Sequence, residues 1–141
     1  MAVEVEIGTA IPEFAREAGL HAWNRFAAVN DEFVPIHMDD EAGREAGFSS
    51  AIGMGNLIWS YFHCVMRDWL DGRGRIEKIS VRYLQPNLRE SVLTVRAKVA
   101  EVSEEAGATR VALELVAQDD AERQLVTGQA TVVIARPGAA S

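Results

Sequence analysis

The chain has 141 residues, 48% of them hydrophobic and 25% charged, which is typical of one folded domain and excludes a largely disordered protein. Its formal net charge of −7 repels nucleic acid and anionic membranes at long range, so neither is an expected partner. Cys64 is the only cysteine, which excludes an intrachain disulfide and a thiolate zinc site within one chain.

The N-terminal segment, residues 1–10, carries Glu4 and Glu6 and has no apolar core, so we do not expect a signal peptide. No run of about 18 apolar residues occurs, so no membrane span is expected. With the single cysteine, these features predict a cytoplasmic protein. We expect one domain over residues 1–141, with the small-residue tail 136–141 disordered.

Two short helices are predicted in the first half of the chain, over about 21–29 and 39–46. Asp39 and Asp40 are expected to be the N-cap and a first-turn residue of the second helix. The rest of the region from residue 11 to the long helix is predicted to consist of turns.

The segment between these helices holds an acidic pair, Asp31 and Glu32, a proline, and His37 five or six residues beyond the acids. Pro35 favours an extended conformation in the residue before it, so this loop can bring a carboxylate and an imidazole together. Water addition across a conjugated double bond uses such a pair: one group activates water and the other exchanges a proton at the α-carbon. The alternative is structural: a hydrogen-bonded loop histidine and two solvated turn residues.

A helix is predicted over residues 55–70, where apolar residues repeat at three- and four-residue spacing, and Asp71-Gly72-Arg73-Gly74 ends it. Free N–H groups point out of a helix start, so the Gly53 amide could act as an oxyanion hole for a thioester enolate. Alternatively, Gly53 and Gly55 only allow the helix to begin close to the sheet.

Apolar and polar residues alternate in the second half of the chain, which predicts four antiparallel strands with one buried face. The apolar stripes are Ile79, Val81 and Tyr83; Leu93, Val95, Ala97 and Val99; Val111, Leu113, Leu115 and Ala117; and Val126, Ala130, Val132 and Ile134. We expect a meander covered by the 55–70 helix, which is the α+β hot-dog fold: a long central helix wrapped by a curved antiparallel sheet.

The order of residues in three segments resembles the MaoC-like, (R)-specific enoyl-CoA hydratase family. These segments are Phe26-Ala27 with Pro35-Ile36-His37-Met38-Asp39, then Ala51-Ile52-Gly53-Met54, then Val81-Arg82-Tyr83 with Pro86. The resemblance runs from about residue 26 to 86 and, less specifically, through the strands to residue 135.

The family pattern Gly-Asp-x-Asn-Pro-Ile-His, laid over the chain without gaps, places Glu32 on the catalytic aspartate and His37 on the catalytic histidine. Asp31 falls on the family's glycine and Val34 on its asparagine, and Ile52 replaces a usual histidine. The resemblance therefore implies His37, the Gly53 amide, and either Glu32 or, after a one-residue shift, Asp31 as catalytic groups.

The resemblance also implies the reaction: addition or removal of water at the 2,3 double bond of an acyl-CoA or acyl-carrier-protein thioester. Coenzyme A would enter only as the substrate carrier, and neither a metal nor another cofactor is expected. A homodimer or higher homo-oligomer is implied, and candidates for the coenzyme A phosphates are Arg67, Arg73, Arg75, Arg82 and Arg89. The altered motif leaves two alternatives: a non-catalytic subunit paired with a paralogue, and an acyl-CoA thioesterase.

Overall fold

The protein is described here from a computed structural model, in which residues 5–136 are placed. Its elements, in chain order, are β1 (Ala10–Ala18), α1 (Leu20–Asn30), α2 (Pro35–Met38), α3 (Asp40–Glu45), α4 (Gly55–Leu70), β2 (Gly74–Tyr83), β3 (Ser91–Glu105), β4 (Ala108–Gln118) and β5 (Gln124–Ala135). Most of the tail that was predicted to be disordered, residues 137–141, lies outside the described part. Within residues 5–136, no helix has the length and hydropathy needed to span a membrane.

The five strands form one antiparallel sheet in the order β1-β3-β4-β5-β2. Strands β3, β4 and β5 form the predicted meander, but the prediction that β2 continues it beside β3 is wrong. Strand β2 pairs with β5 instead, from Gly74 opposite Ile134 to Tyr83 opposite Val126. Alternation of apolar residues identifies the buried face of a strand but not its neighbour, so the sequence pattern could not decide this placement.

Strand β1 was not predicted, because its sequence lacks a regular alternation. Only Ile11 and Ala18 are buried along it, and Pro12 lies where the pairing register with β3 shifts. Strand β1 has a neighbour on one side only, and proline is tolerated in such an edge strand because one row of N–H groups needs no partner. The prediction of turns and helices throughout this region was therefore wrong for β1.

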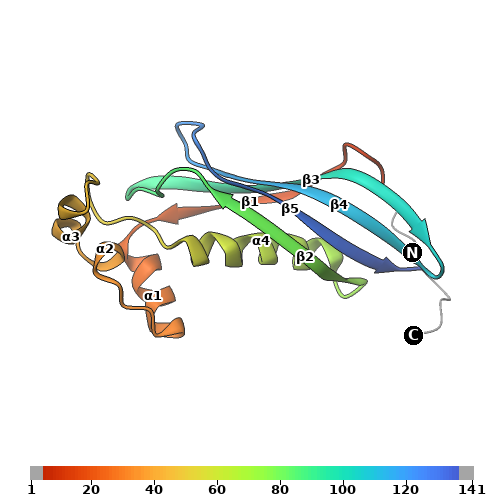
Figure 1. The fold of residues 1–141 in the computed structure, drawn as a ribbon, viewed down its shortest axis with the longest axis horizontal. Coiled ribbons are helices and arrows are strands. Elements are labelled where there is room, and N and C mark those ends of the chain that lie inside the picture. Colours follow the sequence, from red (N-terminus) through yellow and green to blue (C-terminus); the bar gives the residue numbers. More distant parts are fainter. Residues whose placement is uncertain (1–4, 137–141) are drawn as a thin grey trace.

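Helix α4 runs along one face of the sheet, and this packing forms the main core (Figure 1). Its bounds agree with the predicted helix, and its buried side chains are Leu57, Ile58, Phe62, Val65, Met66 and Leu70. Every residue of the predicted stripes on β3, β4 and β5 is buried beneath it. The α+β hot-dog prediction is confirmed: a long helix lies against a curved antiparallel sheet.

Helices α1, α2 and α3 gather at one end of the sheet, beside the start of α4 (Figure 1). A second, smaller core holds α1 there, with Trp23 and Ala27 of α1 packed against Met54 and Leu57. Asp39 caps α3 as predicted, since its carboxylate accepts a hydrogen bond from the Glu41 N–H. The two predicted short helices are therefore confirmed, and they lie next to the segment that begins α4.

Candidate active site

His37 lies on the single helical turn α2 rather than in an irregular loop, and its side chain is half-buried. Val34 before the proline is extended, as predicted, and Pro35 occupies the first helical position. The Nδ1 atom of His37 lies 2.9 Å from the carbonyl oxygen of Ile52, just before α4. Because a carbonyl can only accept, Nδ1 carries the proton in this hydrogen bond, and Nε2 is left with a free lone pair.

The two acidic candidates occupy different environments at the end of α1. Asp31 is exposed and takes the left-handed conformation, with φ of 54°, that ends the helix. Glu32 is half-buried, and both of its carboxylate oxygens lie 3.5 Å from the Nδ2 atom of Asn56, in the first turn of α4. Of the two, only Glu32 therefore has a recorded side-chain contact with the helix start that borders His37.

The Gly53 amide is not free. Its N–H donates to the carbonyl oxygen of Asn87 at 2.7 Å, and the adjacent Ile52 and Leu88 form an isolated antiparallel bridge. The proton of the predicted oxyanion donor is therefore already bonded within the protein in this structure.

Close packing accounts for both glycines at the start of α4. A Cβ atom on Gly53 would lie 2.9 Å from Nδ2 of Asn87 and 3.0 Å from Nε1 of Trp23. A Cβ atom on Gly55 would lie 2.8 Å from the ring of Tyr83. The structural alternative drawn from the sequence, that these glycines let α4 begin close to its neighbours, agrees with this geometry.

A cavity of about 320 Å³ opens beside His37 and Gly53. It lies between the start of α4 and the turn that follows β2, and most of its surface is apolar. Its lining residues are His37, Phe48, Ile52, Gly53, Gly55, Ile58, Tyr83, Leu84, Gln85, Pro86, Asn87 and Val126. Neither Asp31 nor Glu32 is among them, so the structure brings His37 and Gly53 to one cavity and leaves both acids outside its lining.

Tyr83 and Asp40 stabilise the walls around this cavity. The Tyr83 hydroxyl donates to the Gly55 carbonyl at 3.1 Å, and burial raises the pKa of the phenol above its ordinary value. The Asp40 carboxylate accepts from the Ala51 N–H at 3.1 Å and forms an ion pair with Arg89. The Ala51 hydrogen bond first, and then Arg89, hold the pKa of Asp40 below its ordinary value.

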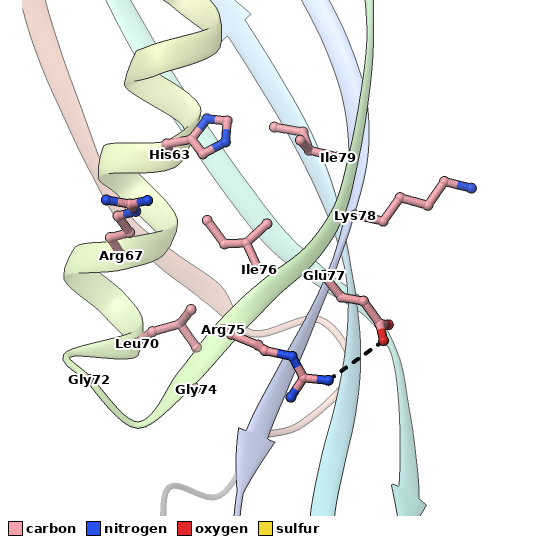
Figure 2. A pocket seen from close by; sticks show the side chains of 10 residues that line it. All are labelled: His63, Arg67, Leu70, Gly72, Gly74, Arg75, Ile76, Glu77, Lys78 and Ile79. Carbon is pink, nitrogen blue, oxygen red and sulfur yellow. Dashed lines mark ion pairs between the residues drawn. The ribbon is translucent and has the colours of Figure 1, made fainter.

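A larger cavity of about 630 Å³ lies elsewhere, between the second half of α4 and β2 (Figure 2). His63 and Arg67 project from the helix, Ile76 and Ile79 point towards it from β2, and Lys78 points away. None of the predicted catalytic residues lines this cavity. It runs along β2, which is an edge strand of the sheet.

The five arginines suggested for coenzyme A phosphates have different surroundings. Arg89 forms an ion pair with Asp40, and Arg73 donates from Nε to the Leu70 carbonyl at 2.8 Å. Both side chains therefore make contacts within the folded chain. Arg75 lies 3.8 Å from Glu77. Arg67 and Arg82 are exposed, and within residues 5–136 no ion pair is recorded for either. These two are the arginines best placed to meet an anionic ligand.

Two polar residues near the site were missed from the sequence. Asn56 approaches Glu32, and Asn87 is only 3% exposed and lines the cavity. Asn87 ends the sequence Gln85-Pro86-Asn87, which is typical of a turn, and nothing in a turn sequence indicates that the asparagine side chain is buried. Among residues 5–136, no cluster of three or more His, Cys, Asp or Glu side chains could hold a metal ion.

Comparison with known proteins gives a family match and several solved structures with this fold. The (R)-hydratase from A. caviae involved in PHA biosynthesis superposes with a TM-score of 0.82 at 23% identity, covering 93% of this chain and 98% of that one. R-hydratase PhaJ1 from Pseudomonas aeruginosa gives a TM-score of 0.84 at 21% identity, covering 95% and 84%. No curated protein sequence matches.

A third similar structure is the ChsH1–ChsH2 complex from Mycobacterium tuberculosis, with a TM-score of 0.82 at 16% identity, covering 94% of this chain and 100% of the matched one. The family model described as the MaoC like domain matches residues 12–121, which include α1 to α4, the His37 turn and every lining residue of the cavity except Val126. The chain therefore belongs to the MaoC-like dehydratase family.

Proposed function

We propose that this chain is an enoyl-thioester hydratase, or a 3-hydroxyacyl-thioester dehydratase in the reverse direction, acting on acyl-CoA or acyl-carrier-protein thioesters. The observation that carries the proposal is the His37 imidazole, fixed through Nδ1 and bordering a mostly apolar cavity of about 320 Å³. Membership of the MaoC-like family and the fold shared with two (R)-hydratases support it.

The proposed reaction uses the free lone pair of His37. Nε2 removes a proton from water as the water oxygen bonds to the β-carbon, and the electrons of the double bond move towards the thioester oxygen. The imidazolium then returns a proton to the α-carbon on the same face, so the product carries one added water. Glu32 orients the attacking water, and we prefer it to Asp31 because its carboxylate approaches the start of α4.

The test is an assay of the purified chain with crotonyl-CoA, comparing the wild type with His37→Ala. We expect hydration by the wild type, loss of hydration in the variant, and the same far-ultraviolet circular dichroism for both. Full turnover by the variant would contradict the assignment. Release of free thiol without hydration would instead favour the thioesterase alternative.

A non-catalytic role in a heteromeric hydratase is the second candidate. It is favoured by two observations: no carboxylate from Asp31 or Glu32 lines the cavity, and Val34 is 41% exposed where the family motif has asparagine. The similarity to the ChsH1–ChsH2 complex makes a paralogue a reasonable partner. No hydration by the purified chain, with hydration restored by a co-purified paralogue, would support this role over homo-oligomeric catalysis.

A further inference from the structure

Asn87 is a buried amide in the wall of the proposed active site. It follows Pro86 in the connection between β2 and β3, is 3% exposed, and lines the same cavity as His37. Its backbone carbonyl accepts a hydrogen bond from the Gly53 N–H at 2.7 Å, and this bond joins the backbone segments on the two sides of the cavity. The backbone of Asn87 is therefore held at a defined position beside the cavity.

The Asn87 side chain has almost no hydrogen-bond partner within the protein. The Ser91 hydroxyl lies 3.4 Å from Oδ1, but it lies only 2.8 Å from the Leu88 carbonyl and has one proton to donate. For Nδ2, no acceptor is recorded among residues 5–136. Among residues 5–136, Nε1 of Trp23 is the only fully buried side-chain N or O atom without a partner, so Nδ2 of Asn87 keeps some accessible surface and is free to donate. A ligand oxygen in the cavity would supply the missing partner.

A second unpaired donor lies beside Asn87. Nδ2 of Asn87 and Nε1 of Trp23 lie 2.9 and 3.0 Å from the position that a Cβ atom would take on Gly53. Trp23 is fully buried, and its Nε1 has no hydrogen-bond partner in the described part of the chain. Two side-chain N–H donors without a recorded acceptor therefore lie beside Gly53, which favours an oxygen that carries negative charge there.

We propose that Nδ2 of Asn87 donates a hydrogen bond to the carbonyl oxygen of the substrate thioester. This inference rests on the proposed hydratase function. The Gly53 N–H is already bonded to the Asn87 carbonyl, whereas Nδ2 of Asn87 has no recorded acceptor among residues 5–136 and Asn87 lines the cavity. As water adds to the β-carbon, negative charge moves onto the thioester oxygen, and a fixed donor there lowers the barrier.

Asn87→Leu and Asn87→Asp test this assignment in the full-length protein. Leucine removes the polar group, and aspartate keeps the shape but replaces the N–H donor with a carboxylate. We expect kcat for crotonyl-CoA hydration to fall by about 10²–10³-fold in each, the usual effect of removing one such donor. Asn24→Leu, the same change at an exposed position on α1, is the matched control and should keep wild-type turnover. Near-wild-type kcat in Asn87→Asp would overturn the proposal.

An infrared measurement separates this proposal from the proposed function. With butyryl-CoA labelled with ¹³C at the carbonyl, a donor to the thioester oxygen lowers the carbonyl stretching frequency in the bound state. We expect that shift in the wild type and its loss in Asn87→Asp. The shift without hydration would support the Asn87 contact while refuting the hydratase function. Hydration without the shift, or a shift unchanged in Asn87→Asp, would refute the contact alone.

Discussion

His37 donates a hydrogen bond from Nδ1 to the carbonyl oxygen of Ile52, 2.9 Å away across the start of α4. The acceptor is a backbone atom, so the identity of the Ile52 side chain is irrelevant to this contact. The hydrogen bond orients the ring and assigns the proton to Nδ1, which leaves Nε2 as the only basic atom of the imidazole. Catalytic and structural roles of His37 can therefore be separated by replacing one nitrogen at a time.

We expect His37→Asn to fold normally and to be inactive. The asparagine amide can reproduce the donor at Nδ1 but has no atom that replaces Nε2. The melting temperature should stay close to that of the wild type, while hydration of crotonyl-CoA falls by about 10²–10⁴-fold, the usual contribution of a general base. An active His37→Asn variant would show that Nε2 is not the base.

Glu32→Gln and Asp31→Asn should differ sharply in activity. The half-buried Glu32 carboxylate approaches Asn56, and its neutral isostere should lower kcat by about 10²-fold or more if it orients water. Asp31 is exposed, and asparagine tolerates its left-handed conformation, so Asp31→Asn should keep both stability and turnover. If Asp31→Asn lost more activity than Glu32→Gln in the same assay, Asp31 would be the catalytic acid. The loop would then have to be shifted by one residue in the active state.

Gly53→Ala and Gly55→Ala should have unequal effects on stability, although both add one methyl group. At Gly53 the methyl group would meet the buried Asn87 and Trp23, which cannot move away easily, and overpacking of this kind costs about 1–3 kcal/mol. At Gly55 it would meet Tyr83, whose side chain is half-exposed and can rotate outward. Urea unfolding should therefore show a clear loss for Gly53→Ala and little change for Gly55→Ala. Equal losses would contradict this packing.

Asp40→Asn should destabilise the protein at neutral pH and have less effect in acid. The Ala51 N–H and Arg89 hold the pKa of Asp40 below its ordinary value of 3.8, so the ionised form is the one that folding favours. The stabilisation is therefore complete above that value and is lost as the pH falls through the lowered pKa. Thermal melts should therefore show the largest difference between the two proteins at neutral pH, and this difference should shrink as the pH falls below 3.8.

Arg89→Gln provides the control for this pair. Since Asp40 and Arg89 form one ion pair, the double variant should lose less stability than the two single losses added together. Strict additivity at neutral pH would mean that the ion pair contributes nothing. Arg89 would then be available again as a ligand for phosphate.

The elements that depend on periodicity could be predicted from the order of residues alone. The apolar spacing in α4 and the alternation in β3, β4 and β5 follow directly from which side chains must leave water, so these elements and their buried faces were predictable. The MaoC-like order of residues around His37 was also visible, because the spacing within a short segment is a property of the chain alone.

Which segments contact each other could not be predicted in this way and is known from the folded structure. Strand β2 lies beside β5, and β1 pairs with β3 despite Pro12, because pairing depends on contacts between residues far apart in sequence. The same reason applies at the site: the 2.7 Å hydrogen bond between Gly53 and Asn87 joins residues 34 positions apart. A turn sequence shows that a chain reverses direction, but whether its asparagine faces water or a cavity is fixed by what packs against it.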